Sequence, residues 1–367
     1  MLAPTMQDVA LGTQNLTALA ESFMAAGLRS RVLTSLFNQG QPIQVMPGNT
    51  AVWKQITGRR HLAPLSGSTS PHVQTGAVAE EDKTSALARI KLYKDIPGDR
   101  LYDQTAPGMV TPDGQQRIRI ELQDLVNQIG DTVERACGLV LSTGKFTASA
   151  ANFPGTTGVF DLDFGASSNL AFTRSAAWST NTTKILSADL VTAIQTAYEQ
   201  GCGKEAGTIV FNRSVLASLI KNVEFQEFVK YTAGAALVRA IGMQDAASRV
   251  LSEFRPGGVD WLCASGSFLP QGGSVTPYFP DSTIAVLPDQ SMLGDTLGMA
   301  MGRGTVPTGP VFISGAEGAA SGLRPASSAG IYSYAEVKGD VPSVRIYAGL
   351  VFLPVLLNPI NLMRGSA

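Results

Sequence analysis

Histidine and cysteine, the residues most often found at catalytic and metal sites, are scarce in this sequence. Its 367 residues include two histidines, His61 and His72, and three cysteines, Cys137, Cys202 and Cys263. No two cysteines have the C-x-x-C spacing of a zinc site, and widely separated thiols are typical of a reducing compartment. Both histidines lie in a stretch rich in Gly, Ser and Thr, which is a poor support for a catalytic triad. We therefore expect no enzyme activity, no cofactor and no metal site.

Charge is also low, and neither sign dominates. The chain has 28 basic and 29 acidic residues, and charged residues make up 16% of it, below the usual quarter. A balanced chain gives no electrostatic argument for nucleic acid as a tightly bound ligand, although a local basic face stays open. Few charges also suit a protein that hides much of its surface in contacts between subunits.

Long hydrophobic runs are missing. The most apolar run, residues 347–357, is too short to span a bilayer and contains Pro354. The N-terminal residues lack the basic and apolar regions of a signal peptide. The sequence predicts a soluble, intracellular protein without a membrane partner.

Phosphate-binding motifs also fail on their spacing. The segment GLVLSTGK (138–145) is one residue longer than a phosphate loop, and Phe146 stands where the motif needs Ser or Thr. Asp161 and Asp163 could share a cation, but a single D-x-D pair in a turn is usually solvated. We interpret both segments as structural.

The clearest positive pattern is a long amphipathic helix over residues 117–141. At about 1.5 Å per residue it would form a rod of roughly 35 Å. Charged residues are expected on its polar side: Arg117, Arg119, Glu121, Asp124, Asp131, Glu134 and Arg135. Apolar residues recur at helical spacing and predict one packing stripe: Ile118, Leu122, Leu125, Val126, Ile129, Val133, Ala136 and Val140. The pattern alone would also fit a core helix of an ordinary domain.

The segments before this helix do not resemble a compact domain. Residues 1–48 predict an arm with a helix over 6–24. Residues 49–98 predict a long two-stranded arm, with strands at 51–57 and 87–96 around a Gly/Ser/Thr-rich tip. Two strands of this length are not stable alone in water. The arm must therefore lie on its own domain or on a neighbouring chain.

The segments after the helix predict a mixed α and β region. Residues 185–300 contain helix signals, such as Asn212 as the N-cap of 213–222, and buried strands at 207–212, 259–265 and 282–289. Residues 302–342 are rich in Gly, Ala, Ser and Pro and predict loops. Residues 343–360 predict strands that return to pack, with Pro354 at a break or an edge position.

Six stretches in this order resemble the major capsid proteins of tailed phages, and the lambda-type major head protein in particular. They are SGSTSPHVQTGAVAEED (66–82), LSTGKFT (141–147), AAWST (176–180), GTIVFNRSVLASLIKN (207–222), YFPDSTIAVLPD (278–289) and VRIYAGLVFLPVLLNPINL (344–362). Each stretch is short, and their shared order over about residues 50–362 carries the resemblance.

The resemblance implies the α+β Hong Kong 97-type (Johnson) fold. Residues 1–48 would be the N-terminal arm and 49–98 an extended loop over a neighbouring subunit. Residues 99–184 would form the peripheral domain around a spine helix at 117–141, residues 185–300 the axial domain, and 301–367 loops and C-terminal strands that return to the peripheral domain. The protein would self-assemble through arm and loop contacts into an icosahedral virion capsid, in the cytoplasm of a bacterial host.

The resemblance also implies partners. The chain would contact itself in pentamers and hexamers, a portal, and packaged double-stranded DNA without sequence readout. Because the extended loop starts near residue 50, we expect a separate scaffold protein. Some family members cross-link through loop lysines; here we expect none, with strengthening by arm contacts or a decoration protein. The residues that we expect at contacts between subunits are Trp53, Lys54, Arg59, Arg60, Leu65, Lys91, Tyr93 and Lys94.

Three alternatives remain at this point. The first is a shell protein of a cellular nanocompartment with the same fold. The second is an α/β hydrolase-like or carbohydrate-binding protein with a long lid, which would need an ordered His61 or His72. The third is another virion component, such as a tail or portal subunit.

Overall fold

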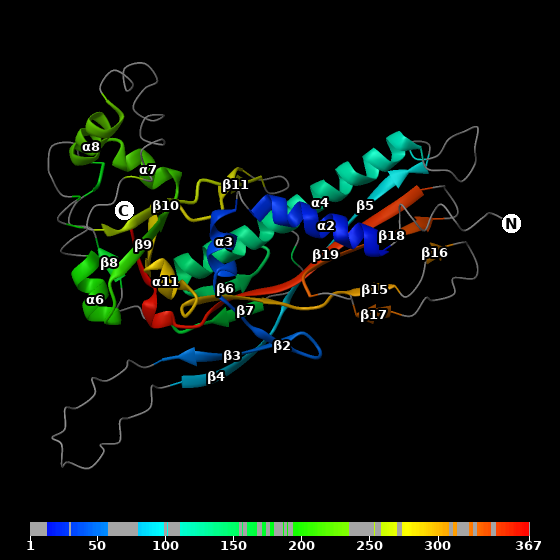
Figure 1. Cartoon of the computed structure of the whole chain (residues 1–367), viewed down its shortest axis with the longest axis horizontal. Helices are drawn as coiled ribbons and strands as arrows, with labels where there is room; N and C mark the ends of the chain where they lie inside the picture. Colours follow the sequence, from blue (N-terminus) through cyan, green and yellow to red (C-terminus); the bar gives the residue numbers. More distant parts are fainter. Residues whose placement is uncertain are drawn as a thin grey trace, which may run out of the picture.

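The body of the protein contains two β-sheets joined by a long helix (Figure 1). The computed structural model describes residues 13–28, 31–57, 80–98, 101, 111–153, 156, 160–166, 171–173, 177–179, 186, 189, 194–234, 253, 258–269, 274–307, 311–313, 323–325, 329–338 and 343–366. Every structural statement below refers to these residues. The predicted sites Arg59, Arg60 and Leu65, and both histidines, lie outside them.

The long helix, α4 (Pro112–Thr143), has clear signals at both ends. The hydroxyl of Thr111 accepts a hydrogen bond from the Gly114 N–H, and Pro112 occupies the first turn, where its missing N–H costs nothing. Gly144 ends the helix in the left-handed conformation, with φ 70°. The helix therefore begins five residues before the predicted start at 117, because the cap lies upstream of the apolar stripe.

The first sheet has six strands in the order β1-β14-β19-β18-β16, with β5 also paired to β19. Helices α2 (Thr13–Leu28) and α4 cover one face, through contacts that include the Thr17 hydroxyl on the Ser333 carbonyl at 3.0 Å. The strands are β1 (Gln41–Pro42), β5 (Ala88–Pro97), β14 (Leu297–Met301), β16 (Val311–Ile313), β18 (Ile331–Lys338) and β19 (Ser343–Leu356). Pro354 lies in β19 beyond Phe352, where the pairing with β5 stops, so among described strands this stretch has β14 alone as partner.

The second sheet has the order β10-β9-β13-β20-β8 and carries shorter helices. Its own apolar cluster is built around Trp178, Tyr198, Phe211 and Trp261. Asn212 caps α7 as predicted, because its side-chain oxygen accepts from the Ser214 N–H at 3.0 Å. The elements are β8 (Ala171–Thr173), α6 (Thr196–Cys202), β9 (Ala206–Phe211), α7 (Arg213–Leu219), α8 (Val223–Ala233), β10 (Asp260–Cys263), β13 (Thr283–Pro288) and β20 (Met363–Ser366).

The pairing of strands divides the chain differently from the predicted segments. Strand β14 lies inside the predicted 185–300 unit but belongs to the first sheet, whereas β20, at the C-terminal end, joins the second sheet through β13. Residues 302–342, predicted as loops, contain β15 (Thr305–Pro307), β16, β17 (Leu323–Pro325) and β18. These pairings join residues far apart in sequence, so local composition does not reveal them.

The N-terminal residues, predicted as an arm, instead contain helices that pack into the body. Helix α2 begins at residue 13 rather than 6, and α3 (Val32–Asn38) follows it. Leu16, Leu33 and Phe37 are at most 2% exposed and belong to the main apolar core. Residues 13–38 are thus part of the body.

Candidate functional site

A β-hairpin leaves the body beside the first sheet (Figure 1). It consists of β3 (Thr50–Ile56) and β4 (Glu80–Ala86), with the short β2 (Gln44–Met46) on the other side of β3. The strand predicted at 87–96 is present as β5 (Ala88–Pro97), but its predicted pairing with 51–57 is wrong, because residues 80–86 pair with β3 and β5 pairs with β19. The apolar alternation of β5 reflects the body sheet, which has a covered and an open face.

The base of the hairpin is attached to the body by apolar and polar contacts. Trp53 is 5% exposed, and its ring centroid lies 6.3 Å from that of Phe164. The Gln55 side-chain amide donates to the Phe164 carbonyl, and the Ile56 N–H donates to the Leu357 carbonyl at 2.9 Å. Trp53, predicted as a contact between subunits, is thus buried within its own subunit, where it packs against Phe164.

A side-chain amide fixes the turn that leads into the hairpin. Asn49 has φ 60°, a left-handed conformation that Asn tolerates better than most residues. Its Nδ2 donates to the Arg303 carbonyl at 2.9 Å, and its Oδ1 accepts from the Arg303 N–H at 3.0 Å. This two-bond contact holds the turn to the segment that follows β14.

The outer strand of the hairpin is charged and exposed. Glu80, Glu81 and Asp82 are all exposed in β4. Lys54 lies 3.6 Å from Glu80, with 72% of its side chain exposed. Surface pairs of this kind contribute little to stability. These charges remain available to a partner and discourage unselective pairing of the strand edge.

The predicted contact residues of β5 lie on two different faces of the body. The Lys94 ammonium contacts the carboxylates of Glu121 (2.8 Å) and Asp124 on α4. Burial disfavours its charge, but these hydrogen bonds outweigh burial and raise the pKa of Lys94. Lys91 and Tyr93 lie on the open face, where Tyr93 is 56% exposed. Lys94 thus has partners within its own subunit, and Lys91 and Tyr93 remain proposals for contacts between subunits.

The spine helix buries its whole predicted stripe and one charge that the sequence did not reveal. Ile118, Leu122, Leu125, Ile129, Val133 and Val140 are all at most 3% exposed. Glu134, which its spacing placed on the polar side, is 4% exposed. Its carboxylate accepts from the N–H groups of Leu33 (2.9 Å) and Thr34 (2.7 Å) and from the Thr34 hydroxyl (2.7 Å). Glu134 thus caps α3 from another helix.

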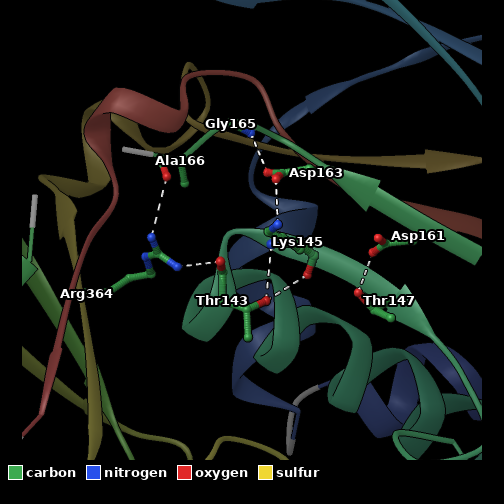
Figure 2. A network of polar contacts seen from close by, with 8 residues as sticks. All are labelled: Thr143, Lys145, Thr147, Asp161, Asp163, Gly165, Ala166 and Arg364. Carbon is green, nitrogen blue, oxygen red and sulfur yellow. Dashed lines mark hydrogen bonds and ion pairs between the residues drawn. The ribbon is translucent and has the colours of Figure 1, made fainter. Parts of the chain in front are cut away.

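A polar network surrounds the C-terminal end of α4 (Figure 2). The Lys145 ammonium lies 2.7 Å from the Asp163 carboxylate, and the Thr147 hydroxyl donates to Asp161 at 2.6 Å. These contacts join β6 (Lys145–Ala148) to β7 (Phe160–Asp163). The D-x-D pair is engaged by a lysine and a hydroxyl, and the described residues contain no cluster of side chains that could hold a metal.

Arg364 connects this network to the second sheet (Figure 2). From β20 its guanidinium donates to the Thr143 carbonyl, at the end of α4, and to the Ala166 carbonyl at 3.5 Å. A cation at a helix C-terminus is favoured by the helix dipole. The candidate phosphate loop is therefore a helix end: Gly138 is inside α4, Gly144 caps it, and Lys145 pairs with Asp163.

The Lys145–Asp163 contact predicts a pH effect. Hydrogen bonds from Lys145 and the Gly165 N–H lower the pKa of Asp163. Because the pKa of Asp163 is lower in the folded state than in the unfolded state, ionised Asp163 stabilises the fold at pH values above its unfolded-state pKa. This contribution is lost as the pH falls through its folded-state pKa. We expect Asp163→Asn to lower the urea midpoint of the subunit at neutral pH, and this difference to vanish in acid. Asp161→Asn is the control, because it removes a neighbouring carboxylate whose bonded partner is a neutral hydroxyl. If the urea midpoints of the wild type and Asp163→Asn differ by the same amount in acid as at neutral pH, the stabilising role of the Lys145–Asp163 contact is contradicted.

Among the described helices, none is both long enough and apolar enough to span a membrane.

Comparisons with known proteins place these features in context. A family model described as phage major capsid protein E matches residues 13–298. No curated protein matches the chain. The structure of a putative prophage capsid protein from E. coli CFT073 has TM-score 0.56 and 13% identity, covering 96% of this chain and 98% of that chain. The mature capsid of bacteriophage PhiM1 has TM-score 0.45 and 11% identity, with 90% and 86% coverage. A holo-encapsulin complex from Synechococcus elongatus PCC 7942 has TM-score 0.43 and 11% identity, with 92% and 86% coverage.

Proposed function

We propose, because this chain belongs to the phage major capsid protein E family, that its copies close into the icosahedral head of a tailed double-stranded DNA phage through contacts made by the β3–β4 hairpin. The chain is a structural shell protein with the α+β Hong Kong 97-type fold. The family match favours a phage head over a cellular nanocompartment and over a hydrolase.

The observation that carries the hairpin contact is the exposure of β4. In this strand Lys83 and Ser85 are half-buried and the other five residues are exposed, although the base of the hairpin is attached to the body. A hairpin gains little stability on its own in water. Packing it on a neighbouring subunit would bury its surface and add contact area without a larger core.

The energetics of a shell fit this arrangement. Specific interfaces bury about 1,600 Å² and obligate ones more, and a subunit in a shell repeats several contacts at once. Linked contacts reinforce one another by effective concentration, so each can stay weak and reversible during assembly. A chain with 16% charged residues has few charges to desolvate in these interfaces.

Partners beyond the subunit itself belong to this proposal. A scaffold protein would guide assembly, a portal would occupy one vertex, and a decoration protein would strengthen the shell. The packaged DNA would be enclosed without sequence readout, in keeping with a net charge of −1. Assembly in the bacterial cytoplasm is supported by the three free cysteines, because free thiols persist in reducing compartments.

Electron microscopy of the purified protein, alone and with a candidate scaffold, tests the proposal. We expect closed shells, tubes or sheets from the full chain. The matched variant reverses the charge of three exposed residues of β4 by replacing Glu80, Glu81 and Asp82 with lysine. It should fold, with an unchanged circular dichroism spectrum, and should form no shells. A full chain that stays monomeric at high concentration would overturn the shell, and a variant that assembles normally would overturn the hairpin contact.

A further inference from the structure

The two strands of the β3–β4 hairpin are joined to the body at one residue, Asn49. The Asn49 carbonyl accepts a hydrogen bond from the Leu87 N–H at 3.1 Å, and Leu87 is the single residue between β4 and β5. The Asn49 side chain binds the Arg303 backbone through both its amide nitrogen and its amide oxygen. Asn49 therefore holds the entry strand, the exit strand and a body segment together. We call the Asn49–Arg303 pair of hydrogen bonds the root contact.

The body segment on which the root contact is made is itself fixed to the first sheet. The Gly302 N–H donates to the Val351 carbonyl in β19 at 2.9 Å. The Gly302 carbonyl accepts from the Gly330 N–H, directly before β18, at 3.0 Å. The root contact thus attaches the hairpin to a segment that is hydrogen-bonded to β19 and to the start of β18.

The residues at this junction are those that its geometry requires. Asn49 has φ 60°, a conformation that asparagine and glycine adopt more readily than other residues. A Cβ added at Gly302 would lie 2.5 Å from the Asn49 Oδ1 and 2.9 Å from the Val351 Cγ1. The Asn49 side chain therefore occupies space that glycine at position 302 leaves open.

The hairpin has a second set of polar attachments, near the other end of β3. The Gln55 amide donates to the Phe164 carbonyl, and the Ile56 N–H donates to the Leu357 carbonyl at 2.9 Å. Asn49 and Ile56 lie at opposite ends of a strand roughly 20 Å long. A rod that is held at both ends has a fixed direction, whereas a rod held near one end can tilt. The root contact is therefore placed to fix the direction of the hairpin.

We infer that Asn49 is a positioning residue for assembly, which acts by holding the β3–β4 hairpin at one angle to the first sheet. The inference rests on the proposed hairpin contact between subunits and names the residue that presents the hairpin. A segment that is held in its docking position beforehand loses less conformational entropy when it binds. Asn49→Gly keeps the left-handed backbone accessible and removes both side-chain hydrogen bonds. We expect it to raise the subunit concentration needed for assembly by roughly fivefold.

Spin labels measure the direction of the hairpin in the unassembled full-length subunit. The labels are attached at Thr84→Cys, an exposed position of β4, and at Gln128→Cys, an exposed position of α4. A Cys263→Ser background removes the native cysteine that is not buried. We expect one narrow distribution of label distances with Asn49 in place and a broader one with Asn49→Gly. Gly302→Ala should also broaden the distribution, because the added methyl group displaces the Asn49 side chain.

Asn152→Gly is the matched control. The Asn152 side chain also donates to a backbone carbonyl, that of Thr147 at 3.0 Å, but it lies between β6 and β7, outside the hairpin. Both changes replace an asparagine with glycine and remove side-chain hydrogen bonds to the backbone, so the two variants should lower the urea midpoint by similar amounts. Asn152→Gly should leave the label distances and the concentration needed for assembly unchanged.

Three results would overturn the positioning role of Asn49. They are an unchanged, narrow distance distribution in Asn49→Gly, an unchanged assembly concentration for that variant, and an equal rise in assembly concentration for Asn152→Gly, which would assign the effect to stability. Failure of the unsubstituted chain to form particles would overturn the proposed shell instead. The label distances would still test the root contact in that case, so the two failures are distinguishable.

Discussion

Replacing Glu134 by alanine is expected to lower the free energy of unfolding of the subunit by roughly 3–5 kcal/mol. The carboxylate is 4% exposed and accepts three hydrogen bonds from the start of α3. Its removal leaves two backbone N–H groups and the Thr34 hydroxyl without their acceptor in a buried site. The lost packing of the side chain adds to this cost.

The contact also decides where α2 and α3 lie. Arg31, which precedes α3, has a side chain 8% exposed and contacts Asp131 at 3.3 Å and the Asn127 carbonyl at 3.0 Å. Together with Glu134, these contacts attach the N-terminal helices to the spine helix at several consecutive turns. Loss of Glu134 should therefore loosen α3 before the sheets unfold.

Urea unfolding of the unassembled subunit measures the effect, and hydrogen exchange of residues 32–38 locates it. Glu134→Gln should lie between wild type and Glu134→Ala, because its amide oxygen can still accept while its NH₂ group faces a donor. Gln128→Ala, at an exposed position of the same helix, should cost less than about 0.5 kcal/mol. Equal effects of Glu134→Ala and Gln128→Ala would contradict the capping role.

Local patterns predicted those elements whose signals lie within a few residues. The apolar stripe identified α4, and Asn212 identified the start of α7, because caps and helical spacing are local features. The shared order of six short stretches pointed to the capsid family, and the family model agrees. Fold class and function were therefore accessible without coordinates.

Contacts between distant segments were not accessible. The strand over 88–97 pairs with β19, some 250 residues later, and nothing in its alternation distinguishes that partner from β3. Glu134 looks like any surface glutamate until α3 is placed against it. Trp53 looked like an anchor for a neighbour, but its own subunit supplies Phe164 as the partner. In each case the sequence does not show which distant residue packs against the segment in the folded chain. That contact outweighs what the local sequence pattern suggests.

Gly138→Ala is expected to destabilise the subunit by roughly 2–4 kcal/mol, the opposite of what helix propensity predicts. In the interior of a helix, alanine is favoured over glycine by about 1 kcal/mol. Here, however, the added Cβ would lie 2.3 Å from the Tyr278 carbonyl oxygen and 3.3 Å from a Leu33 methyl. The first of these atoms is backbone, so the segment at Tyr278, directly after β12 (Thr276–Pro277), must move away from the helix. That movement also weakens the hydrogen bond from Arg135 to the Tyr278 carbonyl.

The matched control is Gly130→Ala in the same helix. Its added Cβ would lie 2.2 Å from the Arg31 guanidinium, a side-chain group that can shift without moving the backbone, although it then loses its contacts with Asp131 and the Asn127 carbonyl. It gains the same helix propensity, so urea unfolding should show a smaller loss than for Gly138→Ala. A Gly138→Ala subunit that is more stable than wild type would show that the close approach of β12 to the spine helix is not required.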